Sequence, residues 1–358
     1  MQVAKTAYAF QISGNPISCS ELGNGHINTT YKILMDTGEE YVLQRINKYV
    51  FKRPDQVMDN ASAITNHLRT KITDPRDALR FIPAKSGLYY HVDEYGEFWR
   101  MCDYVGGFSL DYPDSDEDFY QSALAFGRFQ HMLDDFPADS LHETIPNFHN
   151  TAHRFHMLRN SALDNPCGRL ANVQADLDAI LAQEEICSRL RRMLDAGELP
   201  LRVTHNDTKL NNVLLDRKTR KSLCVLDLDT VMPGLSAYDF GDSIRFGAAT
   251  AAEDEPDTSK MGLDLHLFEV YTRGFLEAAP NLTDKEVEVL PLGALTMTLE
   301  LVARFLKDYI DGDLYFKIAY PEHNLVRARA QMALGLDMLK KWDEMNRIVA
   351  QVAKQVRR

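Results

Sequence analysis

The sequence lacks the features that mark several classes of protein. Its five cysteines include no C-x-x-C pair, so the pattern predicts neither a zinc site nor a redox pair of that kind. The sequence contains no run of about eighteen apolar residues, the length needed to span a bilayer, and residues 1–14 lack the pattern of a secretion signal. We therefore expect a cytoplasmic protein with reduced thiols.

Positive charge is also scarce, because the 358 residues carry a formal net charge of −12. Such a charge repels nucleic acids and acidic membrane surfaces, so we expect neither as a partner. Apolar residues make up 45% of the chain and charged residues 26%, which is the balance of a protein that folds throughout. A small molecule is the expected ligand.

The pattern of apolar residues changes along the chain. Short strands are predicted at 17–22, 29–35, 40–46, 87–92 and 98–104, with one helix at 54–70. Helical periodicity dominates after Gly106, for example at 118–133 and 324–356. We therefore predict a β-rich lobe over 1–105 and a mainly helical lobe over 106–358.

One island of strand character interrupts the helical half and holds the residues of greatest chemical interest. The pattern over residues 202–227 predicts a loop, a strand, a polar turn and a second strand that ends in a carboxylate. Asp207, Asn212 and Asp227 occur there in the order expected of a proton-accepting carboxylate followed by two oxygen ligands for Mg²⁺. Phosphoryl transfer requires little more from a protein than this set of groups.

The H-x-D-x-x-x-x-N pattern and the strand that ends in Asp227 resemble the aminoglycoside phosphotransferase-like kinases, relatives of choline and homoserine kinases. The resemblance is closest to members of that family that phosphorylate N-acetylhexosamines at C1. It is carried by blocks at 25–31, 202–215, 238–247 and 320–327. It implies an α+β, protein-kinase-like fold in which ATP is held between a small β-rich lobe and a larger helical lobe.

The same resemblance implies roles for individual residues. Asp207 would be the catalytic base, Asn212 and Asp227 would bind Mg²⁺, and Asp229 would support the metal. Asp229 has an alternative role as a hydrogen-bond anchor, and a carboxylate such as Asp207 can also cap a loop. His205 is expected to order the loop rather than to react.

The nucleotide site departs from the kinase pattern. Gly23, Asn24 and Gly25 would form the phosphate loop, although the same residues also suit an ordinary hairpin turn. Gln44 stands where kinases place a lysine, and the following helix has Ser62 where the acidic partner would be. We therefore expect Mg²⁺ and backbone amides to carry more of the stabilisation of the phosphates. Strand alternation directs the neighbouring Arg45 to the other face.

A literal Asp-Phe-Gly at 239–241 is similar to the metal-binding signature of protein kinases. Asp227 follows Asn212 by fifteen residues and ends a strand, whereas Asp239 lies farther on, just before a helical pattern. We therefore predict that Asp239 is an N-cap that buttresses the site rather than a metal ligand.

The resemblance implies that recognition of a neutral sugar would fall to His26, Phe246, Arg304 and Tyr315, together with Asp207. Each of the first four also has a structural alternative: a turn for His26, packing for the two aromatic residues, and an ion pair with Glu300 for Arg304. Two other functions stay open. One is a kinase of the same fold that acts on an aminoglycoside, choline or another sugar, for which the acidic run 253–257 could line the pocket. The other is an inactive nucleotide-binding protein.

Overall fold

The computed structural model describes residues 2–22 and 28–357, and the chain divides into two compact units. The first unit comprises 1–109, 132–146 and 212–233, and the second comprises 110–131, 147–211 and 234–358. The opening stretch of the first unit ends at Ser109, near the expected boundary at Gly106, but this unit also takes in two later segments. The division into lobes 1–105 and 106–358 stays a prediction.

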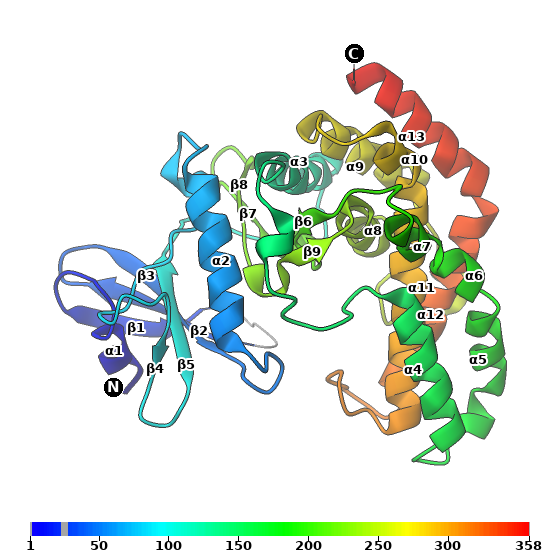
Figure 1. The fold of residues 1–358 in the computed structure, drawn as a ribbon, viewed down its shortest axis with the longest axis horizontal. Coiled ribbons are helices and arrows are strands. Elements are labelled where there is room, and N and C mark those ends of the chain that lie inside the picture. The colour runs from blue at the N-terminus through cyan, green and yellow to red at the C-terminus, as the bar shows by residue number, and fades with distance from the viewer. Residues whose placement is uncertain (1, 23–27, 358) are drawn as a thin grey trace. The chain divides into compact units, whose positions relative to one another are not determined.

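The first unit is built on an antiparallel sheet of five strands in the order β1-β2-β3-β5-β4 (Figure 1). These strands are β1 (Pro16–Glu21), β2 (Thr29–Met35), β3 (Glu40–Ile46), β4 (His91–Val92) and β5 (Phe98–Asp103). Ile33 and Met35 of β2 and Leu43 of β3 are fully buried and pack with Phe10, which follows α1 (Gln2–Ala7). Alternate residues of these strands therefore form the core of the unit.

Helix α2 (Pro54–Arg69) belongs to the same unit and begins at Pro54, a residue suited to the first helical turn because it has no N–H to donate. Val57, Ala61 and Ile64 form its buried face. The remaining elements of the unit are η1 (Pro75–Asp77), η2 (Ala138–Ser140), β7 (Val213–Leu215), β8 (Ser222–Val225) and η5 (Leu228–Thr230). Strands β7 and β8 form a hairpin that leads into η5.

The second unit is mainly helical, and α11 (Leu290–Asp311) lies at its centre, against α4, α8 and α12 (Figure 1). Its other helices are α3 (Asp116–Met132), α4 (Thr151–Asp164), η3 (Leu170–Asn172), α5 (Gln174–Leu181), α6 (Glu184–Cys187), α7 (Arg189–Asp195), α8 (Ser236–Gly247), η6 (Thr258–Lys260), α9 (Leu265–Ala278), α10 (Asp284–Glu288), α12 (His323–Lys340) and α13 (Trp342–Val356). Strand β6 (Arg202–Thr204) leads into the loop that carries Asp207, and η4 (Leu210–Asn212) and β9 (Met232–Gly234) lie where the chain passes from one unit to the other.

Helices α8 and α11 approach one another backbone to backbone. A Cβ built on Gly241 would lie 2.3 Å from the carbonyl oxygen of Gly293, and one built on Gly293 would lie 2.2 Å from the carbonyl oxygen of Ala237. Both distances are shorter than any real carbon contact, so only glycine fits at these two positions. The two helices are therefore in direct contact along their backbones.

This architecture is a kinase-like fold, with a small antiparallel-sheet N-lobe and a helical C-lobe, and it confirms the predicted fold class. Two local expectations were wrong. The predicted helix over 324–356 is divided at Lys341 into α12 and α13, and the predicted strand over 87–92 is reduced to His91 and Val92. Among the described residues, no helix is long and apolar enough to cross a membrane.

Candidate active site

The hairpin β7-β8 brings two of the predicted metal ligands together in the first unit. Val213 pairs with Val225, and the backbone N–H of Leu226 donates to the carbonyl oxygen of Asn212 at 2.8 Å. Asn212 and Asp227 therefore lie at the same end of the hairpin. Asp227 has φ +54°, a left-handed conformation that is uncommon for residues other than glycine and that often occurs at functional sites.

Asp229 lies two residues farther on and is almost fully buried, with 2% of its surface exposed. One carboxylate oxygen forms an ion pair with Nη1 of Arg100, and the other accepts a hydrogen bond from Nδ2 of Asn28 at 2.6 Å. The role of a hydrogen-bond anchor is therefore realised in the fold. A carboxylate has about four acceptor sites, so these contacts leave room for a support role at a metal.

Oxygen donors from an amide and two carboxylates match the ligands that Mg²⁺ uses, with nucleotide phosphates and water expected to complete the coordination. No group of three or more His, Cys, Asp or Glu side chains able to hold a metal by themselves occurs in residues 2–22 and 28–357. Asn212, Asp227 and Asp229 supply the kinds of oxygen ligand that a magnesium site uses. Their role as ligands stays a prediction.

The positive charge near these residues comes from β5 rather than from β3. Gln44 on β3 is paired in register with Arg100 on β5, and Nε of Arg100 donates to Oε1 of Gln44 at 2.7 Å. Arg45 is exposed and donates to Oγ1 of Thr29 at 3.2 Å, so it turns to the other face, as alternation predicts. The sequence analysis did not identify Arg100. A charged residue between the apolar residues Trp99 and Met101 does indicate a buried ion pair, because a charge inside the core requires a partner.

The loop at 205–209 carries the predicted base Asp207 and is called the catalytic loop below; it belongs to the second unit and is held by α8. The backbone N–H groups of His205 and Asn206 donate to the carboxylate of Asp239 at 2.9 and 2.8 Å, and Nε2 of Gln130 donates to it at 2.6 Å. Burial raises the pKa of Asp239 above its usual value, although these hydrogen bonds oppose the change. Asp239 buttresses the loop, but not as an N-cap, because α8 begins three residues earlier at Ser236.

His205 is fully buried, and its ring meets the edges of Phe126 and Phe129, with centroids 5.4 and 5.9 Å away. Its Nδ1 accepts a hydrogen bond from the backbone N–H of Asp207 at 3.3 Å. Asn206, the residue between them, has φ +65°. The loop is therefore a strained turn packed around an imidazole, and His205 orders it rather than facing a substrate.

Asp207 itself is half-buried, and Oδ1 lies 3.2 Å from Nζ of Lys209. The charge of Asp207 raises the pKa of Lys209, against the effect of burial. Thr208, between them, is fully buried; its N–H donates to Asp242 at 2.8 Å and its hydroxyl donates to the carbonyl of Asp239 at 2.6 Å. These contacts give Asp207 a fixed backbone and a nearby cation, which sequence reasoning did not identify.

Arg304 on α11 lies among aromatic rings. Its guanidinium carbon is 5.2 Å from the ring centre of Phe148, 5.4 Å from that of Phe316 and 5.9 Å from that of Tyr315. The distances suit cation–π attraction. The side chain of Arg304 is 13% exposed, and Tyr315 is 59% exposed. A cation surrounded by rings and an accessible phenol are thus next to each other.

The ion pair of Arg304 with Glu300 is long, at 3.9 Å. Glu300 is fully buried and makes closer contacts with Nδ1 of His149 at 3.0 Å and the hydroxyl of Thr151 at 3.2 Å. Burial alone would raise the pKa of Glu300, but His149 and, more weakly, Arg304 lower it overall. The other ring nitrogen of His149 lies 3.4 Å from the carbonyl oxygen of Asn206, so this network reaches the catalytic loop.

The remaining predicted residues lie in different places. Phe246, near the end of α8, stacks on Tyr112 with ring centres 5.2 Å apart and planes within 10°. His26 and the phosphate-loop residues Gly23, Asn24 and Gly25 fall outside the described residues. The roles expected of these four residues stay predictions.

The acidic run 253–257 is engaged within the second unit. Glu253 pairs with Arg245 at 2.5 Å, Asp254 contacts His323 at 3.0 Å, and Glu255 and Asp257 both contact Lys260. Glu253, Glu255 and Asp257 thus balance protein cations and Asp254 contacts a histidine, so the run is not an unpaired acidic surface.

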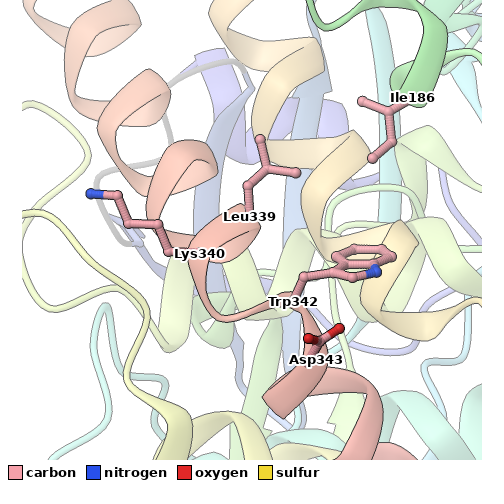
Figure 2. Close-up of a pocket in the computed structure, with 5 residues that line it drawn as sticks. All are labelled: Ile186, Leu339, Lys340, Trp342 and Asp343. Atoms are coloured by element: carbon pink, nitrogen blue, oxygen red, sulfur yellow. The ribbon is translucent and has the colours of Figure 1, made fainter.

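The second unit also has a hollow where α12 and α13 meet. Its lining residues are Ile186, Leu339, Lys340, Trp342 and Asp343 (Figure 2). They come from α6, the end of α12 and the start of α13, and none of them is a predicted site residue. The hollow therefore takes no part in the candidate active site.

The kinase-like fold and the set of oxygen ligands and catalytic-loop residues define a class of phosphate-transferring enzyme. The chain belongs to the phosphotransferase enzyme family that includes the aminoglycoside phosphotransferases, because the model of that family matches residues 18–266, which is more than half of the chain.

Solved structures of low sequence identity share the fold over almost the whole chain. An amicoumacin kinase in complex with AMP-PNP, Ca²⁺ and Ami is 12% identical, with 93% of this chain and 92% of that chain covered and a TM-score of 0.61. An aminoglycoside phosphotransferase from Alicyclobacillus acidocaldarius is 15% identical, with coverages of 99% and 96% and a TM-score of 0.59. A microcompartment-associated aminopropanol kinase is 16% identical, with coverages of 96% and 97% and a TM-score of 0.59.

Proposed function

We propose that the protein is a kinase that uses ATP and Mg²⁺ to phosphorylate the anomeric hydroxyl of an N-acetylhexosamine, either N-acetylglucosamine or N-acetylgalactosamine. Membership of the phosphotransferase family supports the reaction type. The amicoumacin kinase, whose structure contains AMP-PNP and Ca²⁺, supports a nucleotide and a divalent cation. The residues around Arg304 support a neutral sugar as the acceptor, and the choice of an N-acetylhexosamine rests on the resemblance of the blocks at 25–31, 202–215, 238–247 and 320–327.

In the proposed reaction, Asp207 accepts the proton of the C1 hydroxyl as its oxygen bonds to the γ-phosphorus and the bond to the bridging oxygen of ADP breaks. An anomeric hydroxyl is more acidic than the other sugar hydroxyls, so a carboxylate is a sufficient base. Asn212 and Asp227 would hold Mg²⁺, which neutralises phosphate charge when bound. Lys209, 3.2 Å from Asp207, provides a cation beside the reacting group.

The observation that carries the choice of substrate is the combination of Arg304 with accessible aromatic surface. A guanidinium offers several N–H donors to hydroxyl and acetamide oxygens, and a ring such as Tyr315 packs against the apolar face of a sugar. The contact of His149 with the carbonyl of Asn206 joins the network of Arg304 to the loop that carries Asp207. A sugar bound by Arg304 would therefore contact the hydrogen-bond network that also supports the loop of Asp207.

Cationic acceptors fit this arrangement less well. A polycation or choline would be repelled by Arg304, and the acidic run 253–257 already balances protein cations. A different neutral sugar is compatible with the same residues. An inactive nucleotide-binding protein is disfavoured because Asp207, Asn212 and Asp227 are all present.

The test is to incubate the protein with ATP, Mg²⁺ and each candidate acceptor and to examine the product by phosphorus NMR. We expect a phosphate signal coupled to the anomeric proton with N-acetylglucosamine or N-acetylgalactosamine. Phosphate found only at C6, or turnover only with aminoglycosides or choline, would reject this substrate.

A matched pair of arginine variants tests the pocket. Arg304→Ala removes hydrogen bonds from a charged donor, each worth about 1.5–3 kcal/mol, so the KM for the sugar should rise by about 10- to 100-fold while nucleotide affinity is retained. Arg329→Ala, which removes an ion pair with Asp176 at 2.9 Å on the surface of the same unit, is the control. Equal effects of the two substitutions on the KM for the sugar would contradict a substrate role for Arg304.

A further inference from the structure

A row of polar side chains crosses the sheet of the first unit. Thr30, Gln44 and Arg100 are register partners on β2, β3 and β5. Gln44 Nε2 donates to Thr30 Oγ1 at 2.9 Å, and Arg100 Nε donates to Gln44 Oε1 at 2.7 Å. The side chain of Arg100 is only 5% exposed, so this row delivers a cation into the interior of the unit.

The row ends at Asp229, which is fixed from several directions. Arg100 donates to one carboxylate oxygen of Asp229 and Asn28 donates to the other. The backbone carbonyl oxygen of Asp229 accepts a hydrogen bond from the hydroxyl of Thr144 at 3.3 Å. Asn28 is fixed in turn, because its Oδ1 accepts the backbone N–H of Asn47 at 2.9 Å. A buried carboxylate with these partners has little freedom to rotate.

Asp227 is connected to this anchored residue by a single intervening residue. Its left-handed backbone is unfavourable for an aspartate and persists only where neighbouring structure imposes it. On one side, the hydrogen bond from Leu226 to Asn212 sets the chain direction. On the other side, the anchored Asp229 holds the end of the turn.

We propose that Arg100 is a positioning residue for the metal site, which holds Asp229 and thereby fixes the orientation of the Asp227 carboxylate. The proposal rests on the proposed function in so far as Asp227 is taken as a Mg²⁺ ligand. In this arrangement, an arginine on β5 supplies the structural charge that the glutamine at position 44 cannot supply. From the sequence we expected Mg²⁺ and backbone amides to carry more of the stabilisation of the phosphates, and Arg100 had no expected role.

The contacts of Arg100 favour this role over direct binding of phosphate. Its Nε is directed to Gln44 and its Nη1 to Asp229, with the sulfur of Met58 3.8 Å from Nη1. An arginine guanidinium keeps its proton in proteins, and that of Arg100 lies against the carboxylate of Asp229. The guanidinium is therefore charged at every pH at which the protein would be assayed and is already committed to protein partners.

The test compares Arg100→Gln with Arg80→Gln. Arg80 forms an ion pair of 2.6 Å with Asp103 on the surface of the same unit, so its loss controls for the removal of an arginine. Binding of Mn²⁺ is measured by electron paramagnetic resonance in the presence of AMP-PNP without any acceptor. We expect Mn²⁺ to bind at least about 10-fold more weakly to Arg100→Gln, and with unchanged affinity to Arg80→Gln.

Two further measurements separate this role from others. The affinity for AMP-PNP without metal should be unchanged in Arg100→Gln, and a large loss of it would show that Arg100 binds phosphate instead. Unchanged Mn²⁺ affinity with a lowered melting temperature would show a purely structural role and overturn the proposal. Because the assay contains no sugar, an error in the proposed acceptor would appear in the product analysis and leave this result unaffected.

Two milder variants keep the proposal testable if Arg100→Gln does not fold. Arg100→Lys keeps the charge and loses the forked geometry, so it should fold and bind Mn²⁺ with an affinity between those of the wild type and Arg100→Gln. Wild-type Mn²⁺ affinity in Arg100→Lys would overturn the geometric part of the proposal. Gln44→Ala keeps the ion pair between Arg100 and Asp229. The turnover of this variant should therefore fall far less than the roughly 10³-fold loss expected from removing a dominant charge contact. A larger loss would assign the central role to Gln44.

Discussion

The contacts of Asp239 predict that replacing it by Asn damages the catalytic loop and leaves metal binding intact. In the wild type, Oδ2 accepts hydrogen bonds from His205 and Gln130, and Oδ1 accepts one from Asn206. An amide placed with its oxygen at the Oδ2 position would direct its NH₂ group at the N–H of Asn206. One buried donor would then have no acceptor, and two hydrogen bonds would lose their charged acceptor.

The expected decrease in the free energy of unfolding follows from these weakened and lost hydrogen bonds. An unsatisfied buried donor costs about 1–3 kcal/mol, and the two weakened bonds add about 1–2 kcal/mol together. Burial of the wild-type charge, which raises the pKa of Asp239, offsets part of this loss. We therefore expect the free energy of unfolding to fall by about 2–4 kcal/mol. A shift of about 1 Å at Asp207 would lower turnover by roughly 10²-fold.

The assay compares Asp239→Asn with Asp227→Asn. Urea unfolding gives the loss of stability, and a Mg²⁺ titration of turnover, made where both variants are folded, gives the half-saturating concentration. Asp227→Asn should raise that concentration by at least about 10-fold, whereas Asp239→Asn should change it by less than about 2-fold. The reverse order would refute the assignment of the metal site and make Asp239 the ligand.

Two other predictions concern the base and the support of the strand that precedes it. Asp207→Asn keeps the size of the side chain and removes proton acceptance, so turnover should fall by about 10² to 10⁴-fold while nucleotide binding is retained; near wild-type turnover would exclude Asp207 as the base. Burial alone would raise the pKa of Glu286, but its hydrogen bonds with Arg202 lower that pKa overall from its ordinary value of 4.5. The charged carboxylate of Glu286 therefore stabilises the fold above pH 4.5, and this stabilisation is lost as the pH falls through the lower pKa of the folded state. Glu286→Gln should therefore lower the free energy of unfolding by about 3 kcal/mol at pH 7, and the difference from wild type should shrink in urea titrations below about pH 4; a difference independent of pH would contradict the role of this charge.

Strands with regular alternation were predictable from the sequence. Both β2 and β3 match the predicted 29–35 and 40–46, because one face of each strand is buried against the core. The predicted strand 87–92 failed where Gly87 adopts φ +90° in a turn. The helix predicted over 324–356 failed because its break at Lys341 contains no Gly or Pro, the residues that normally mark an interruption.

Spacing along the chain indicated the residues of the candidate site, but not their supports. Asp207, Asn212 and Asp227 lie within one short island, whereas Asn28 and Asp229 are 201 positions apart and meet only in the folded sheet unit. Arg100 is separated from Asp229 by 129 positions. Contacts over such separations depend on strand register, which a single sequence does not encode in any local pattern.

The backbone contact between α8 and α11 has a consequence for how acceptor preference could change. Helix α8 carries Asp239, which holds the loop of the proposed base Asp207, and α11 carries Arg304. The backbone contact at Gly241 and Gly293 leaves no room for these two helices to move closer together. Adaptation to a new acceptor would thus have little scope in the helices themselves. The segment from Gly312 to Glu322, which includes the exposed Tyr315, joins α11 to α12 outside this contact and is where natural variation or directed evolution could alter selectivity without disturbing the chemistry.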